Sequence, residues 1–216
     1  DLARAQRALA TLPEHSIVRQ RAFDVDLLRW ELEHFREWAL DARGIELGAE
    51  QRATFAEAAE YLATTIASWP RGFVHRDYQS RNLMVVAGEN GALNLGWIDF
   101  QDAMLGPRVY DLVALLGDSY QTFDRAFIDS RLGEFCRELG LGAAEEAELT
   151  RQFEMVMVQR KLKDAGRFVF IERKNGNPSF LRFIDPTVAK ARASLSRLAD
   201  DPKLQGLSEL LARLFG

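Results

Sequence analysis

The chain of 216 residues is long enough for one large or two small domains, and its 47% hydrophobic and 28% charged content excludes a disordered protein. A formal net charge of −4 gives no global attraction to nucleic acid, and no apolar run approaches the ~20 residues of a membrane-spanning helix. With Cys136 as the single cysteine and no visible signal peptide, the composition rules out an internal disulfide and predicts a cytoplasmic protein.

The first seventy residues are helical in pattern. Apolar residues recur at helical spacing over 1–12, 23–40 and 50–69, and Pro13 and Pro70 end the first and third segments. In the second segment we expect one apolar stripe made of Phe23, Leu27, Trp30, His34 and Trp38, widened by Leu28, Leu32 and Phe35.

Short apolar runs, partly β-branched, predict strands at 73–74, 83–86 and 93–100. The Asn-Gly pair within 89–92 favours a tight hairpin between the last two strands, and Gly106-Pro107 predicts a turn. Helical patterns then cover 109–116, 123–139, 143–170, 186–199 and 207–215. The fold class that follows is mainly α with a small β-hairpin system, that is, α+β.

The most informative stretch is His75-Arg76-Asp77-Tyr78-Gln79-Ser80-Arg81-Asn82, a polar loop between two apolar strands. Asp99 ends the returning strand, so we expect it beside this loop. An amide and a carboxylate on adjacent strand ends suit Mg²⁺, which prefers oxygen ligands. The carboxylate of Asp77 remains free to accept a proton from an incoming hydroxyl. Arg81 either supplies positive charge to a phosphate or is an ordinary exposed side chain.

This loop, followed by Ile98-Asp99-Phe100-Gln101, resembles the catalytic and metal-binding segments of the aminoglycoside phosphotransferase/choline kinase superfamily, which is related to protein kinases. The match covers essentially the whole chain as the C-terminal lobe of a protein-kinase-like fold, so residues 1–216 are expected to be the helical catalytic lobe. Residues 73–102 then carry the catalytic loop and metal-binding hairpin. Stretches at 28–38, 97–110 and 159–168 further resemble the anomeric kinases of N-acetylmuramate and N-acetylglucosamine in peptidoglycan recycling.

The resemblance implies ATP and Mg²⁺ as cofactors. It implies that Asp77 is the base facing a substrate hydroxyl and that Asn82 and Asp99 hold the metal. Asp111 is expected to accept backbone N–H groups from the loop, and His75 to brace the loop by hydrogen bonding or to be plain core. Gln101 stands where protein kinases carry glycine, which argues against a protein substrate.

A kinase of this class also needs an upper lobe with a glycine-rich turn, a strand lysine and a helix glutamate. Before His75 the sequence shows no such β-rich segment, and its only glycines there are Gly44, Gly48 and Gly72. We therefore expect a fragment that is inactive by itself. Its uncovered apolar face would favour self-association.

The substrate is expected to be a small molecule rather than nucleic acid or membrane. Residues 151–192 carry an excess of Lys and Arg, which suits a neutral or anionic sugar better than a polycation. Aminoglycoside, choline or homoserine kinases, and a non-catalytic binding module, stay open as alternatives. Candidate substrate contacts, each with an ordinary packing or surface role as its alternative, are Trp30, Glu31, Glu33, Trp38, Gln101, Asp102, Arg160 and Lys163.

Overall fold

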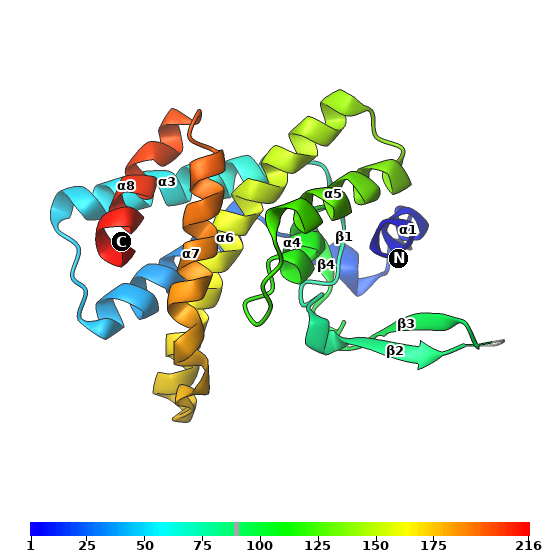
Figure 1. Ribbon diagram of the computed structural model, residues 1–216, viewed down its shortest axis with the longest axis horizontal. Helices are drawn as coiled ribbons and strands as arrows, with labels where there is room; N and C mark the ends of the chain where they lie inside the picture. Colours follow the sequence, from blue (N-terminus) through cyan, green and yellow to red (C-terminus); the bar gives the residue numbers. More distant parts are fainter. Residues whose placement is uncertain (89–90) are drawn as a thin grey trace. The chain divides into compact units, whose positions relative to one another are not determined.

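The computed structural model describes residues 1–88 and 91–216, and the chain divides into two compact units (Figure 1). The first unit comprises residues 1–23 and 69–153, and the second comprises residues 24–68 and 154–216. The mainly α, α+β fold predicted from the sequence is confirmed. The Asn-Gly hairpin predicted at 89–92 falls partly outside the described residues.

In its described residues, the first unit combines short helices with four short strands. Its elements are α1 (Leu2–Ala8), β1 (Arg71–Val74), β2 (Leu83–Ala87), β3 (Leu93–Trp97), β4 (Met104–Pro107), α4 (Tyr110–Leu116), α5 (Arg125–Leu139) and the first turns of α6 (Ala143–Asn175). Asp124 caps α5 by accepting the backbone N–H of Phe127 at 2.7 Å, which satisfies one of the free donors at that helix start.

The strands form two separate antiparallel pairs, β1 with β4 and β2 with β3. The expected turn at Gly106-Pro107 is therefore wrong, because these residues pair with Gly72 and Arg71 at the end of β4. The register also brings Gly106 against Phe23, where a Cβ would lie 2.6 Å from the Phe23 ring. Glycine at this position thus permits a close approach between strand and core.

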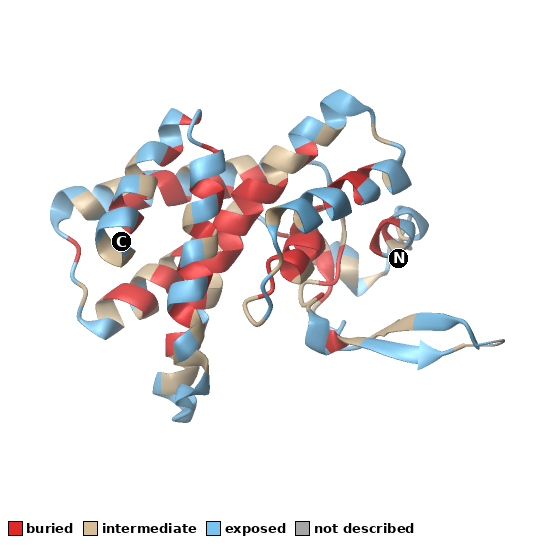
Figure 2. Ribbon diagram, in the orientation of Figure 1, coloured by how far each residue is buried: buried red, intermediate tan, exposed pale blue. Residues whose placement is uncertain are grey.

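Burial in this unit centres on α4, which Figure 2 shows almost entirely in the colour of buried residues. The Tyr110 ring lies 4.3 Å from that of Phe23, and both side chains are fully buried. The β2–β3 hairpin is the opposite case, with Val85 and Leu93 exposed by 67% and 76%. Self-association through an exposed apolar face stays a prediction.

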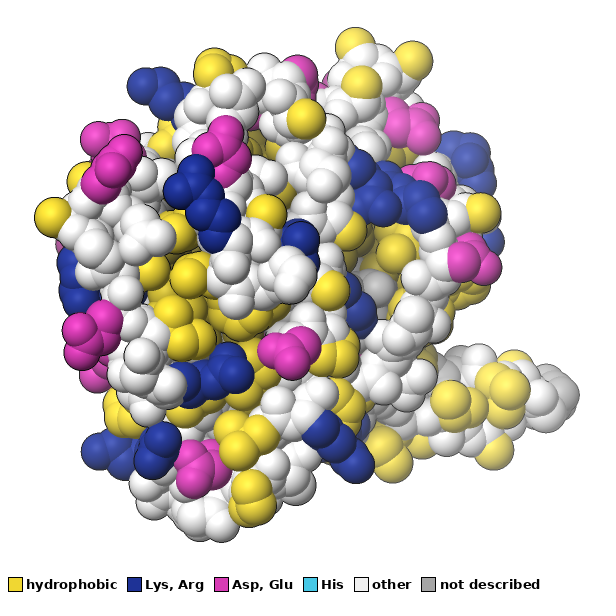
Figure 3. All heavy atoms as spheres, turned by 60° about the vertical axis from the view of Figure 1, so that its left-hand side comes forward, with side chains coloured by type: hydrophobic (Ala, Val, Ile, Leu, Met, Phe, Trp, Pro, Cys, Tyr) yellow, Lys and Arg dark blue, Asp and Glu magenta, His cyan; other side chains and the backbone are white. Residues whose placement is uncertain are grey.

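The second unit is helical throughout its regular elements. They are α2 (Val25–His34), α3 (Ala49–Ser68), the remainder of α6, α7 (Ile184–Arg197) and α8 (Pro202–Phe215). A single turn of π-helix, Phe35–Leu40, extends α2. On the face drawn in Figure 3, acidic and basic side chains are interspersed rather than gathered by sign.

The predicted apolar stripe of residues 23–40 is buried or half-buried in the structure except at Trp30. Leu28, Leu32 and Phe35 are fully buried, whereas Trp30 is 59% exposed. The Phe35 ring lies 6.0 Å from that of Phe55 on α3, so the face that carries Phe35 is the one that packs against α3. The segment is also not one α-helix, because the π-helical turn shifts the periodicity after His34.

Gly166, in the middle of α6, lies against the junction between α2 and the π-helical turn. A Cβ built at this position would come within 2.6 Å of the His34 carbonyl oxygen and 2.9 Å of Phe35 Cα. We expect Gly166→Ala to lower the free energy of unfolding by about 1–3 kcal/mol, because overpacking outweighs the gain in helix propensity. Urea denaturation measures this. Gly133→Ala on α5 is the control, since its Cβ would meet only side-chain tips at 3.3 and 3.4 Å; equal stability changes would contradict the prediction.

Within the described part of the chain, no helix combines the length and apolar character needed to cross a membrane.

Candidate active site

The loop after β1 is fixed by a carboxylate on α4. Asp111, fully buried in the first turn of α4, accepts the backbone N–H of His75 at 2.7 Å and that of Arg76 at 2.9 Å. A buried carboxylate that accepts two backbone donors fixes both the position and the direction of the peptide it binds. This geometry is the one that the supporting role predicted for Asp111 requires.

Asn82 lies between the two predicted acidic residues. Its Nδ2 donates to the backbone oxygen of Asp77 at 2.9 Å and to Oδ2 of Asp99 at 3.3 Å. Asp99 also accepts from Gln101 Nε2 through its other oxygen, Oδ1, at 2.8 Å. The structure therefore brings the end of β3, the polar loop and Gln101 to one place.

Two residues of this site have backbone conformations that side chains rarely adopt. Arg76 has φ 78° and Asp99 has φ 67°, the only positive φ values among described residues other than glycine. Such conformations cost about 1–3 kcal/mol each and persist where surrounding contacts enforce them, most often at functional sites. Here Asp111 holds the N–H of Arg76, and Asn82 with Gln101 holds the Asp99 carboxylate.

The donor set at Asn82 and Asp99 fits a hard divalent cation. Both offer oxygens, they lie in hydrogen-bonding contact, and Mg²⁺ typically takes one or two protein ligands while water and phosphate complete its shell. The described residues include no cluster of three or more His, Cys, Asp and Glu suited to a metal. Asn82 and Asp99 supply only one amide and one carboxylate. A cation held by this pair would need water and a phosphate-bearing ligand to complete its coordination.

His75 supports the loop through packing. Its fully buried ring lies edge-on to Tyr78 at 5.9 Å and to Trp97 at 6.0 Å, and neither ring nitrogen has a hydrogen-bond partner of good geometry among the described residues. Burial lowers the pKa of His75, while Asp77 and the nearby Ile98 backbone act in the opposite direction. Burial also raises the pKa of Tyr78 to about 12, with the Asp111 charge adding to the effect.

Acid should destabilise the protein through its buried histidines. Burial lowers the pKa of His75, and of His34, below the ordinary 6.5. The unfolded chain therefore binds protons first as the pH falls through about 6.5, and the free energy of unfolding decreases below that pH. Urea denaturation across this range should show a shallower decrease for His75→Phe. The exposed His15, changed to Gln, is the control, and identical pH profiles for His75→Phe and wild type would contradict the prediction.

Two supporting contacts were not anticipated from the sequence. Asp118, 2% exposed, accepts from the backbone N–H and the hydroxyl of Ser80 at 3.3 and 2.7 Å. The Arg81 guanidinium lies 3.9 Å from the centre of the Tyr120 ring, so it is packed by a cation–π contact. An acidic residue just beyond the glycine that ends the apolar α4 is the signal that could have indicated Asp118.

The predicted substrate residues divide between the two units. Gln101 and Asp102 lie at the site, where Arg21 donates to the Gln101 carbonyl at 2.7 Å and to Asp102 at 3.4 Å. The others belong to the second unit: Trp30, Glu31, Glu33, Trp38, Arg160 and Lys163. Glu31 is buried and accepts from Gln159 at 2.8 Å, and Lys163 lies 3.0 Å from Asp164.

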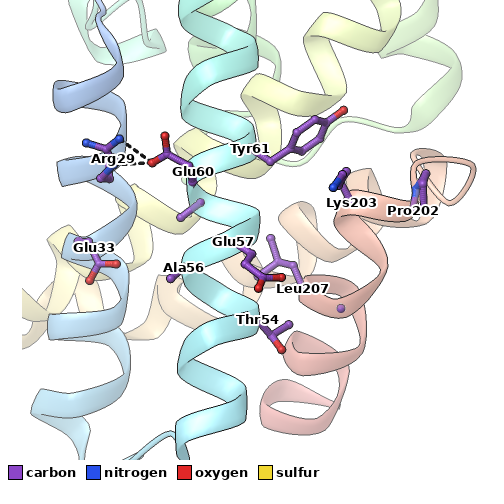
Figure 4. A pocket seen from close by; sticks show the side chains of 12 residues that line it. Arg29, Glu33, Thr54, Ala56, Glu57, Glu60, Tyr61, Pro202, Lys203 and Leu207 are labelled. Atoms are coloured by element: carbon purple, nitrogen blue, oxygen red, sulfur yellow. Dashed lines mark hydrogen bonds and ion pairs between the residues drawn. The ribbon is translucent and has the colours of Figure 1, made fainter.

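A groove of about 920 Å³ also lies in the second unit, across α2, α3 and α8 (Figure 4). Figure 4 shows Arg29 of α2 reaching Glu60 of α3, an ion pair of 2.6 Å, while Glu57 of α3 lies toward α8, which carries Leu207. None of the residues that line this groove belongs to the polar loop or to the Asp99 segment. Its size suits a small ligand, but Arg29 and Glu60 of its lining already pair with each other across α2 and α3.

An asparagine that joins a loop bearing one carboxylate to a second carboxylate is typical of the kinase-like class of phosphotransferases. A family model described as "Phosphotransferase enzyme family" matches residues 1–149, and the chain belongs to this family. The superfamily resemblance drawn from the sequence is thereby confirmed.

Three similar proteins share one name. The chain is 32% identical over 198 residues to a protein of Pseudomonas putida and 34% identical over 199 residues to one of Neisseria meningitidis serogroup B. A protein of Pseudomonas aeruginosa is 32% identical over 205 residues. All three carry the name N-acetylmuramate/N-acetylglucosamine kinase. The matches cover 89–90% of this chain but 56–57% of the relatives, so the chain spans about half of their length.

Proposed function

We propose that the chain is the catalytic lobe of an ATP-dependent kinase that phosphorylates the anomeric hydroxyl of N-acetylmuramate or N-acetylglucosamine. The observation that carries the proposal is the position of Asn82, which is hydrogen-bonded both to Asp77 and to Asp99. The names of the similar proteins support the amino-sugar substrate. The use of ATP agrees with the cytoplasmic location predicted from the sequence.

Asp77 is proposed to accept the proton of the sugar hydroxyl as that hydroxyl attacks. Its backbone is fixed by the bond from Asn82, and Asp111 fixes the two residues before it, so the carboxylate is presented from a rigid loop. Asn82 and Asp99 would hold Mg²⁺, which neutralises phosphate charge when bound. Arg81, oriented by Tyr120, is proposed to add positive charge near the transferred phosphate.

Positive charge on α6 supports a neutral or anionic sugar. Asp164 lies near three cations, at 4.0 Å from Arg160, 2.6 Å from Lys161 and 3.0 Å from Lys163. Although burial favours the neutral acid, these charges hold the pKa of Asp164 well below its usual range. Burial lowers the pKa of Lys161 to about 8. We propose that Arg160 or Lys163 meets the carboxylate of muramate and that Trp30 and Glu31, of the same unit, contact the sugar. The roles of Gln101 and Asp102, in the first unit, stay predictions from the sequence.

Phosphoryl transfer from ATP should be assayed with the full-length protein and a substrate panel. The panel contains N-acetylmuramate, N-acetylglucosamine, an aminoglycoside, choline and homoserine. We expect phosphate to reach the two amino sugars only, and removal of Mg²⁺ by a chelator to abolish transfer, because the metal neutralises the phosphate charge. Transfer to another member of the panel would overturn the substrate, and absence of transfer with retained ligand binding would identify a binding module.

A further inference from the structure

Four aromatic side chains surround the end of α2, and we call them the His34 cluster: Trp30, His34, Trp38 and Phe170. The His34 ring lies 5.5 Å from Trp30, 6.0 Å from Trp38 and 5.4 Å from Phe170. Trp38 meets Phe170 edge-on at 5.0 Å. All four belong to the second unit, and His34 is the central member.

Exposure within the His34 cluster is uneven. Trp30 is 59% exposed, Trp38 and Phe170 are half-buried, and His34 is only 6% exposed. Nε2 of His34 is buried and has no hydrogen-bond partner among the described residues. A buried polar nitrogen without a partner costs about 1–3 kcal/mol, so native proteins usually provide one, from protein, water or ligand. An exposed tryptophan beside such a nitrogen is an arrangement that a polar ligand would complete.

The backbone beneath the His34 cluster is unusually constrained. The π-helical turn Phe35–Leu40 begins directly after His34, and the close approach of Gly166 fixes the junction from the side of α6. Single π-helical turns inside helices occur frequently at functional sites. The π-helical turn and the close approach of Gly166 therefore constrain the backbone that carries His34 and Trp38 next to Phe170 of α6.

Charges at the rim of the cluster come from both helices. The Arg167 guanidinium lies 4.8 Å from the centre of the Phe170 ring, and Lys174 Nζ lies 5.9 Å from that of Trp38. Burial lowers the pKa of His34, and the charges of Arg167 and Lys163 act in the same direction against Glu37 and Glu31. The imidazole is thus neutral at neutral pH, and one of its nitrogens can accept a hydrogen bond from a hydroxyl.

We propose that the His34 cluster is a monosaccharide-binding site, in which Trp30 packs on the apolar face of the sugar and His34 Nε2 binds a hydroxyl. This rests on the proposed function, because it assigns the sugar's place on this chain. A hydroxyl-rich ligand fits better than an apolar protein surface, which would leave Nε2 unpaired. Exposed Arg167 and Lys174 complement a sugar that carries a carboxylate.

The test is isothermal titration of the full-length protein with N-acetylmuramate, without nucleotide or Mg²⁺. We expect Trp30→Ala and His34→Phe each to weaken binding about 10-fold, the equivalent of about 1.4 kcal/mol. His34→Phe keeps an aromatic ring in the cluster, and Trp30 is exposed, so thermal unfolding should report folded variants. Phe127→Ala is the matched control, since it removes another exposed ring that carries an arginine, Arg131, and binding should remain unchanged.

Wild-type affinity in both Trp30→Ala and His34→Phe, or no saturable binding by the wild-type protein, would overturn the inference. The outcome is separable from the proposed function. Binding that these substitutions weaken, in a protein that transfers no phosphate, would remove the kinase proposal and leave the sugar site. Phosphoryl transfer to the amino sugars that is unaffected by either substitution would remove the sugar site and leave the kinase proposal.

Discussion

Asp77→Asn is expected to lower kcat for phosphoryl transfer by about 10²–10⁴-fold, the range over which a positioned general base contributes. The substitution is nearly isosteric and removes the basic oxygen. Asn82 binds the backbone oxygen of Asp77 and not its carboxylate, so that hydrogen bond remains. KM for ATP should therefore change little, and steady-state kinetics of the full-length protein with an amino sugar measure both constants.

Asp129→Asn provides the comparison for this loss of rate. Asp129 is an exposed acidic residue of α5 that pairs with Arg125 at 2.7 Å, so its change removes the same charge away from the loop. It should leave kcat unaltered. A near-normal kcat in Asp77→Asn, with an unaltered unfolding curve, would show that another group accepts the proton.

The sequence predicted the parts of the site that are local in the chain. The polar loop and Asp99 are set by short strands whose patterns are visible directly, and the structure places Asn82 between them. Prediction from the sequence failed where contacts with distant segments determine the local structure. β4 contains no β-branched residue and ends in Gly106-Pro107, and its strand conformation follows from pairing with β1 more than thirty residues earlier.

At α2 the exposure of Trp30 has a similar cause. The helix has apolar residues around most of its circumference, so periodicity alone could not predict that Trp30 lies outside the buried face. The helical segment packs against α3 through Phe35 and Phe55, and Leu28 and Leu32 are buried while Trp30 is exposed. The π-helical turn begins where Gly166 approaches the chain closely, a contact between residues about 130 positions apart. Neither feature has a signal within the segment itself.

Asp111→Ala is expected to cause the largest loss of stability of any single substitution considered. It leaves the buried backbone N–H of His75 and the half-buried backbone N–H of Arg76 without their acceptor. At about 1–3 kcal/mol for each unsatisfied donor, the free energy of unfolding should fall by about 2–6 kcal/mol, against a typical total of about 5–15 kcal/mol. Urea denaturation measures the change.

Asp185→Ala is the matched control for Asp111→Ala, because Asp185 also lies in the first turn of a helix, α7, but is exposed. Both changes remove the same favourable charge from a helix start, which contributes about 0.3–1 kcal/mol at exposed sites. The excess loss in Asp111→Ala then measures the support of the loop. Asp111 accepts the N–H of Arg76, which has a left-handed backbone, so equal losses in the two variants would mean that other contacts fix the loop and its strain.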